Sequence, residues 1–226
     1  MKGGDAVKRI IVLALCVAAA LSLASCSLGD SFLAAMGFDT YDYESEEIIE
    51  TVSPDDKSVD ALKEMIKMLS INDPRLPEFS SSGEALDKCR DAILNYMLNT
   101  GFAKYTGNVD LISSAQENYP ELQLITVIPA EDFENCVYTY FGGNAKLSHR
   151  DSELFTYLEK ADCYTAVTVP IENSVTVNVI RCERTERTYR LKFSCTLGAV
   201  TSPVYDALIV NRTDGSSYFK SLKTNG

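Results

Sequence analysis

The alternation of apolar and polar residues between residues 188 and 197 constrains the fold of this chain more than any other feature. In the segment TYRLKFSCTL the apolar side chains recur at every second position, at Tyr189, Leu191, Phe193, Cys195 and Leu197. Side chains of a β-strand point alternately to the two faces of a sheet, so this pattern predicts a strand with one buried face and one face in water. Antiparallel sheets commonly have such a solvated face.

The segment SVTVNVI, residues 174–180, has the same period and places three valines on one face. A two-residue turn between the two strands would place Val177 opposite the polar Ser194. A loop of residues 185–187 would instead place Val177 opposite Cys195 and Val179 opposite Phe193. The hydrophobic pattern therefore predicts an odd-numbered loop or a bulge in this hairpin.

Two more strands are expected at the C-terminal end. YDALIV and SSYFKSL flank the dipeptide Asp214-Gly215, which is typical of a tight hairpin turn. Together with the two strands before them, they predict an antiparallel meander of four or five strands.

Helical patterns dominate the first part of the chain. Helices are predicted over residues 54–69, 81–100, 108–118, 129–141 and 152–160, and a buried strand over 122–128. The first helix would be capped by Ser53 and the last by Asp151. Ser81 and Glu84 have the spacing of a capping box at the start of the second helix, and Gly101 is placed to end it.

Helices first and strands last indicate an α+β domain, with N-terminal helices packed on a C-terminal antiparallel β-meander. This order resembles the nuclear-transport-factor-2-like (NTF2-like, cystatin-like) cone fold, although the chain shows no diagnostic motif of that family. The resemblance implies an apolar pocket between a curved sheet and the helices. Its candidate lining residues are Tyr189, Leu191, Phe193 and Cys195, which would equally suit a plain core.

The N-terminal end has the features of a bacterial export signal. Three basic residues precede an uncharged apolar run, residues 10–24, of about 22 Å as a helix, which is short for a membrane span. The run closes with Leu23-Ala24-Ser25-Cys26, which resembles the lipobox of bacterial lipoproteins. That resemblance implies cleavage before Cys26 and a diacylglyceryl group on its thiol, which would hold the protein on the outer side of the cell membrane.

These features divide the chain into a signal peptide (1–25), a lipidated, acidic flexible tether (26–52) and a single domain (53–226). Loss of the signal peptide removes three basic residues and one acidic residue, so the net charge changes from −11 to −13. Such a charge disfavours nucleic acid as a partner, because binding to phosphates depends on basic residues. Apart from the membrane, the expected partners are a small apolar ligand or another envelope protein.

Few residues point to chemistry. The cysteines at 89, 136, 163, 182 and 195 lack metal-ligand or redox spacing, so we expect buried free thiols, and no metal or cofactor is predicted. Cys182 and Cys195 would lie on opposite faces of their hairpin, which argues against a disulfide between them. His149 is the only histidine and is expected to be solvated in a polar loop.

Because the sequence shows no catalytic or metal-binding pattern, three hypotheses for function remain. The leading one is a non-catalytic binding or interaction module, and we expect no enzyme activity. The second is an accessory module for an envelope enzyme or transporter, docking through the tether or through the hairpin with Arg181, Arg184, Arg187 and Arg190. A hydrolase with an unrecognised site, using His149 or a buried carboxylate, is the third.

Overall fold

The computed structural model describes residues 41–142, 147–166, 170–171 and 174–225. The expected signal peptide and the lipidation site at Cys26 lie outside these residues, so both stay predictions. Residues Tyr43–Gly226 form one compact unit, to which every element below belongs. No helix in the described part of the chain has both the length and the apolar character needed to cross a membrane.

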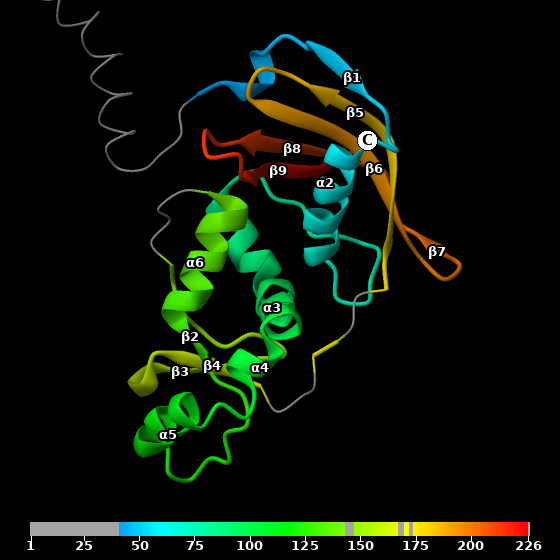
Figure 1. The fold of residues 1–226 in the computed structure, drawn as a ribbon. Helices are drawn as coiled ribbons and strands as arrows, with labels where there is room; N and C mark the ends of the chain where they lie inside the picture. The colour runs from blue at the N-terminus through cyan, green and yellow to red at the C-terminus, as the bar shows by residue number, and fades with distance from the viewer. Residues whose placement is uncertain (1–40, 143–146, 167–169, 172–173, 226) are drawn as a thin grey trace, which may run out of the picture. The chain divides into compact units, whose positions relative to one another are not determined.

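The larger sheet follows the order β1-β5-β6-β8-β9, and a short β7 also pairs with β6 (Figure 1). All its pairings are antiparallel. Its strands are β1 (Glu50–Val52), β5 (Thr176–Arg184), β6 (Thr188–Leu197), β7 (Val200–Thr201), β8 (Tyr205–Asn211) and β9 (Ser217–Thr224). The predicted meander and the α+β class are therefore confirmed.

The β5–β6 register is the one that the hydrophobic pattern favours. Val177 pairs with Cys195 and Val179 with Phe193. At the turn Arg184 pairs with Tyr189, one residue beyond the pairing with residue 188 that the predicted loop implies. The register shifts back between Val179 and Arg181, where Ile180 forms a bulge. The odd residue thus lies inside the strand and not in the turn.

The strand β1 corrects the predicted boundary of the domain. Residues 50–52, which were expected to belong to a flexible tether, pair with β5, and Val52 is buried. A 3-10 helix, η1 (Tyr43–Ser45), precedes this strand. The compact unit therefore begins at Tyr43 and not at residue 53.

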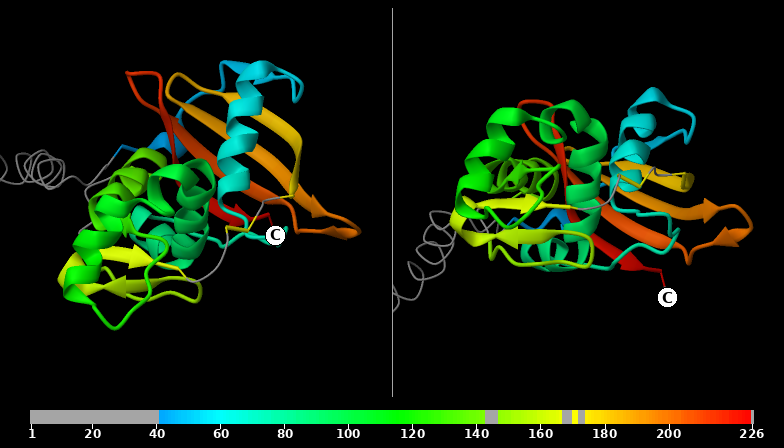
Figure 2. Two further views of the ribbon diagram at one scale, coloured as in Figure 1. Left: turned by 60° about the horizontal axis from the view of Figure 1, so that its bottom comes forward. Right: turned by 90° about the horizontal axis from the view of Figure 1, so that it is seen from below.

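Three helices contribute to the main core, and two of them contact the larger sheet. The three are α2 (Lys57–Met68), α3 (Ser82–Thr100) and α6 (Ala130–Phe141). The helix α2 contacts β5, whereas α6 contacts both β9 and α3 (Figure 2). In α2 the side chains of Leu62 and Ile66 are buried, and Met65 packs partly buried against the same core.

The helix starts show which capping predictions hold. Ser81 accepts a hydrogen bond from the backbone N–H of Glu84 at 3.2 Å, as predicted for α3. Asn108 likewise caps α5 (Val109–Asn118). The predicted start of the first helix at Pro54 is wrong, because Asp56 accepts from the backbone N–H of Ser58 at 2.8 Å and begins the helix there.

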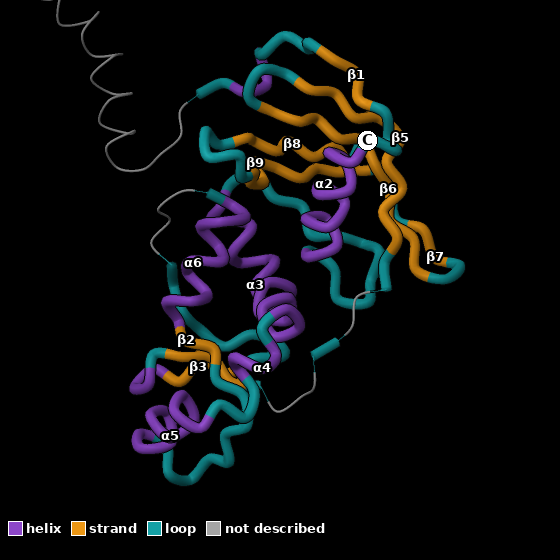
Figure 3. Tube along the Cα trace, viewed as in Figure 1, coloured by secondary structure: helices purple, strands orange, loops and turns teal. Residues whose placement is uncertain are grey.

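A second, smaller sheet was not predicted. Its order is β2-β4-β3, and Figure 3 shows it beside α4 (Phe102–Tyr105), apart from the larger sheet. Its strands are β2 (Ile128–Pro129), β3 (Thr156–Leu158) and β4 (Cys163–Thr165), with the 3-10 helix η2 (Glu159–Ala161) between the last two.

This sheet overturns two predictions. The helix expected at 152–160 is absent, because Asp91 of α3 binds the backbone N–H groups of Glu153 and Leu154 and the chain then extends into β3. The strand expected at 122–128 is reduced to β2 and an isolated bridge at Thr126. The remainder is irregular, and Ile125 is 52% exposed.

Candidate functional site

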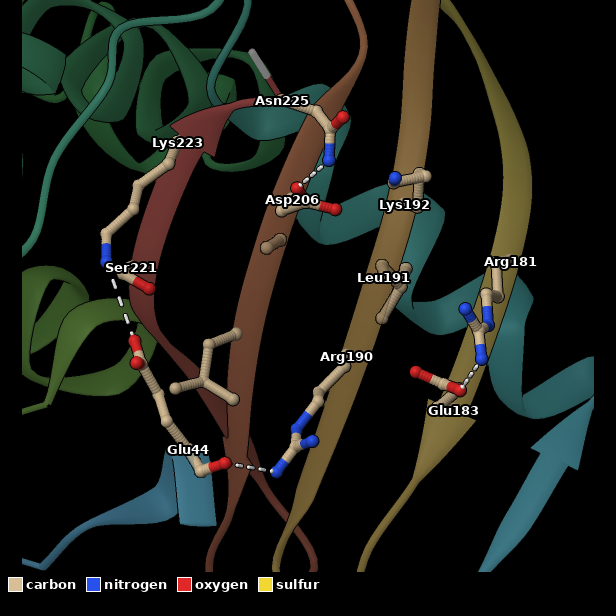
Figure 4. Close-up of a pocket in the computed structure, with 12 residues that line it drawn as sticks. Glu44, Arg181, Glu183, Arg190, Leu191, Lys192, Asp206, Ser221, Lys223 and Asn225 are labelled. Atoms are coloured by element: carbon tan, nitrogen blue, oxygen red, sulfur yellow. Dashed lines mark hydrogen bonds and ion pairs between the residues drawn. The ribbon is translucent and has the colours of Figure 1, made fainter. Parts of the chain in front are cut away.

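A hollow of about 360 Å³ lies on the face of the larger sheet opposite its apolar core face. We call it the outer groove. Figure 4 looks onto it and shows side chains from η1, β5, β6, β8 and β9 around it. The charged residues that line it are Glu44, Arg181, Glu183, Arg190, Lys192, Asp206 and Lys223.

Strand register aligns four of these residues in one row. Arg181 pairs with Lys192, Lys192 with Asp206, and Asp206 with Lys223. Neighbouring strands lie about 4.8 Å apart, so the backbone positions of these residues follow one another at that spacing, and their charges have the order plus, plus, minus, plus. Like charges directly opposite on adjacent strands repel, so the pairing of Arg181 with Lys192 is unfavourable by itself.

Three of the four charged side chains in this row have partners within the chain. Arg181 forms an ion pair with Glu183, and Lys223 approaches Glu44 at 3.5 Å. Asp206 accepts a hydrogen bond from the side-chain amide of Asn225. Lys192, which is half-buried, has no hydrogen-bond or ion-pair partner among the described residues.

Arg190 fixes one end of the groove. A single terminal nitrogen of its guanidinium donates to the carbonyl oxygens of Tyr43, Glu44 and Glu46, at 3.2, 2.9 and 2.8 Å. Because these carbonyls belong to the segment around η1, Arg190 holds the start of the domain against the sheet. Glu44 is thereby placed at the rim of the outer groove.

The side chains of the predicted pocket residues belong to the other face of the sheet, although Leu191 is also among the residues that line the outer groove. Leu191, Phe193 and Cys195 are at most 1% exposed and belong to the apolar core. Tyr189 is partly buried and packs against the same core. The sequence therefore pointed to β6, but to its inner face. The charged hollow lies on the outer face of the same strand, with Arg190 and Lys192.

His149 is not the solvated residue that its polar surroundings predicted. Its Nδ1 lies 3.0 Å from the hydroxyl of Tyr164, and its Nε2 lies 3.0 Å from Oε1 of Glu134. Its ring stacks on Tyr157, with the centroids 5.0 Å apart. The side chain of His149 is only 14% exposed.

Arg90 completes this histidine cluster from α3. Its guanidinium donates to the Tyr164 hydroxyl at 2.6 Å and to the carbonyl oxygen of Ser148 at 2.8 Å. Since Tyr164 Oη accepts from Arg90, its proton is free to go to Nδ1 of His149, whose Nε2–H then donates to Glu134. Burial raises the pKa of Tyr164, which keeps it protonated.

The cluster is built like a proton relay but lacks a reacting position. Tyr164 has no exposed surface and Arg90 is 3% exposed, so a substrate would not reach either group. Only Glu134 is well exposed at the end of the chain of hydrogen bonds. We therefore interpret the cluster as a link between α3, α6 and the smaller sheet.

The five cysteines that the structure describes are free, and four of them are buried as expected, whereas Cys136 is only partly buried. Burial raises the pKa of Cys89, Cys136 and Cys195 to about 12, so these thiols stay protonated near neutral pH. The reason given against a Cys182–Cys195 disulfide is wrong, because the bulge turns Cys182 to the same face. Cys182 pairs with Leu191, and the four residues from Leu191 to Cys195 span about 13 Å, too far for a disulfide.

The arginines of the β5–β6 hairpin contact the domain's own N-terminal segment. Arg184 forms an ion pair with Glu50 of β1 at 2.8 Å, and the backbone N–H of Arg187 donates to Glu46 at 3.3 Å. Glu46 also accepts from the hydroxyl of Thr185. The hairpin expected to dock a partner therefore holds residues 46–50 of the same chain.

Among the described residues no group of histidine, cysteine, aspartate or glutamate side chains is arranged to hold a metal ion. Comparison of the chain with protein-family models, curated proteins and solved structures gives no match. The arguments for function therefore rest on the geometry of the chain itself.

Proposed function

We propose that this chain is a membrane-anchored, non-catalytic binding protein of the bacterial cell envelope, and that its ligand occupies the outer groove. The observation that carries the proposal is the row of charges at Arg181, Lys192, Asp206 and Lys223 in a recess on the sheet. In a small-molecule site a few placed polar groups fix the orientation of the ligand, and this recess carries more charged side chains than most such sites.

The proposed anchor is a lipid on Cys26. It is supported by the order of a basic start, a short apolar run and the lipobox-like Leu23-Ala24-Ser25-Cys26. Two acyl chains hold a protein on a membrane where a single chain gives only marginal binding. The domain would then lie on the extracytoplasmic face of the membrane.

The anchor is tested by mass spectrometry of membrane fractions. Wild-type chain should begin at Cys26 and carry the mass of a diacylglyceryl group, whereas Cys26→Ala should lack it and leave the membrane pellet. An unmodified Cys26 in the membrane-bound wild type would contradict the proposed anchor.

The relation to the NTF2-like cone fold is part of the same proposal. Helices packed on one face of an antiparallel meander support it. The site that we propose differs from the pocket implied by that resemblance, because Leu191, Phe193 and Cys195 fill the space between sheet and helices. This closed core favours the outer face as the place for a ligand.

The non-catalytic assignment is supported by the settings of the histidine and the cysteines, which are the side chains most able to act as a base or a nucleophile. The histidine cluster is closed around Tyr164, and burial keeps the thiol of Cys136 protonated. At the β5–β6 hairpin, Arg184 forms an ion pair with Glu50 and the backbone N–H of Arg187 donates to Glu46, so we favour the outer groove over this hairpin as the place for a ligand. A ligand-binding role for the outer groove is what the side chains favour.

Thermal melting of the full chain in neutral detergent tests the proposed site. A ligand at 100 times its Kd adds about 2.7 kcal/mol to the stability of the folded state, which raises the midpoint by about 5–10 °C in a protein of this size. The library should contain sugars, cell-wall fragments, peptides, apolar molecules and small anions.

A matched pair of variants locates the binding. Asp206→Tyr narrows the groove, whereas Asp110→Tyr makes the same change on the exposed face of α5. The ligand-induced shift should vanish in the first variant and persist in the second. A library without any stabilising ligand, or a shift that persists in Asp206→Tyr, would contradict the proposed site.

A further inference from the structure

We propose that the outer groove recognises an oxyanion, a carboxylate or phosphate group of a small soluble molecule, held between Arg181 and Lys192. This inference deepens the proposed function and rests on it. It assigns a chemical class to the ligand and a role to two side chains.

The first argument is that two positive side chains, Arg181 and Lys192, stand next to each other. Arg181 and Lys192 face each other on adjacent strands, and Lys192 lacks a partner among the residues that the structure describes. Two opposed cations weaken a strand pair, and no carboxylate of the described residues pairs with the Lys192 ammonium. An oxyanion between the two side chains lowers this repulsion and pairs with Lys192.

The geometry of Arg181 is the second argument. One terminal nitrogen of its guanidinium is engaged by Glu183, which is only 9% exposed and therefore held in place. This contact orients the guanidinium and leaves its other N–H donors for a ligand. Lys192 adds a second cationic side chain from the next strand, whose backbone lies about 4.8 Å from that of β5.

The neighbours of this pair limit the size of the ligand. Asp206 follows Lys192 in the row, and Glu44 stands at the rim of the groove. In a chain with a net charge of −11, these carboxylates oppose an extended polyanion or an anionic membrane surface. A small soluble solute with one oxyanion, and a hydroxyl or ammonium group for Asp206, fits the row.

Equilibrium dialysis of the full chain in neutral detergent tests the assignment, with succinate and inorganic phosphate as probes at matched ionic strength. Lys192→Gln and Arg181→Gln should each weaken binding by about tenfold or more, as expected for loss of a hydrogen bond to a charged group. Lys57→Gln, which removes an exposed positive charge from the start of α2, should leave binding unchanged.

Thermal melting gives a second readout. Added succinate or phosphate should raise the melting midpoint of wild type more than that of Lys192→Gln, because the variant has lost one cationic donor. High salt should reduce this difference, since it screens exposed charges. Lys57→Gln controls for the change in net charge.

The outcomes separate this inference from the proposed function. Failure of both probes to bind, or equal binding by wild type and Lys192→Gln, would overturn the oxyanion assignment. If a neutral or cationic ligand from the melting library still required the groove, the proposed site would stand and this inference alone would fall. Loss of probe binding in both groove variants, with Lys57→Gln unaffected, would support it.

Discussion

Arg90 lies almost wholly inside the protein and binds groups from two other segments. Its guanidinium donates to Tyr164 of β4 and to the carbonyl oxygen of Ser148, and it lies over the ring of Phe133 at 5.7 Å. A buried charge of this kind is tolerated only where its hydrogen bonds are made. The side chain therefore ties α3 to α6 and to the smaller sheet.

Replacing this residue should be costly. Arg90→Met keeps an unbranched side chain but leaves the Tyr164 hydroxyl and the Ser148 carbonyl without their donor. Hydrogen bonds to charged groups contribute about 1.5–3 kcal/mol, so we expect a loss of this size in urea unfolding. Arg75→Met, at an exposed ion pair, should change the unfolding free energy by no more than about 0.5 kcal/mol. Similar stability of the two variants would contradict a structural role for Arg90.

Glu84 gives the stability a defined dependence on pH. Hydrogen bonds from the backbone and side chain of Ser80, together with Lys88, lower its pKa from 4.5 to about 2. A lowered pKa in the folded state stabilises the protein above the ordinary pKa, and this contribution is lost as the pH falls from about 4.5 toward 2.

The sign can be checked with Glu84→Gln. Wild type should melt above the variant at pH 6, and the gap should close as the pH falls toward 2. Glu117→Gln, on the exposed surface of α5, controls for the loss of one negative charge. A gap between wild type and Glu84→Gln that stays constant down to pH 2 would contradict the assigned cause.

At the scale of elements, local signals explain which parts of the fold the sequence predicted. The cap of α3 at Ser81 is a contact within three residues, and that prediction is confirmed. The cap of α5 at Asn108, which was not predicted, is equally local. The smaller sheet depends instead on pairings such as Ile128 with Tyr164, which are far apart in the chain. Strands of two or three residues are also too short to show a period.

The same distinction applies to the candidate site. The alternation around Leu191 revealed the strand and its two faces, but not the register that sets Arg181 beside Lys192 and Lys192 beside Asp206. The bulge at Ile180 decides that row, and nothing local in the sequence fixes its position. The partners of His149 are also fifteen residues away on either side.

The β5–β6 register itself is open to a direct test. Val177 lies opposite Cys195, and opposed residues of an antiparallel pair have Cα atoms about 4.5–5.5 Å apart, within the range of a disulfide. Val177→Cys should therefore form a disulfide with Cys195 on refolding in a thiol–disulfide buffer, detectable by mass spectrometry of the digested protein.

Thr176→Cys is the discriminating control for this register. Thr176 pairs with Thr196 in the structure and should not link to Cys195. With a two-residue turn, residue 176 would instead lie opposite Cys195. A 176–195 disulfide without a 177–195 disulfide would overturn the register.

At the scale of the whole domain, the two faces of the larger sheet differ, because one closes the apolar core and the other carries the charged outer groove. Phe193 has no exposed surface and packs among core residues, whereas its neighbour Lys192 points to the outer groove. Phe193→Ala should lower the free energy of unfolding by about 3–5 kcal/mol, because it leaves a cavity in the core.

The adjacent Lys192→Gln should leave the fold intact, with a change within about 0.5 kcal/mol at moderate salt. Chemical unfolding of both variants checks this contrast. The ligand should raise the melting midpoint of Phe193→Ala by as much as that of wild type. If it bound Phe193→Ala more weakly than wild type and bound Lys192→Gln normally, the site would lie on the inner face.

The contacts around η1 also determine how the domain would bear tension. A pull from residues N-terminal to Tyr43 reaches the carbonyls held by Arg190 before it reaches β1. Arg190 belongs to β6, which has neighbours on both sides, so the load passes into the middle of the sheet. The three-residue edge strand β1 is then spared from peeling away, and a domain tethered through its N-terminal end could withstand drag at a surface without unravelling from that end.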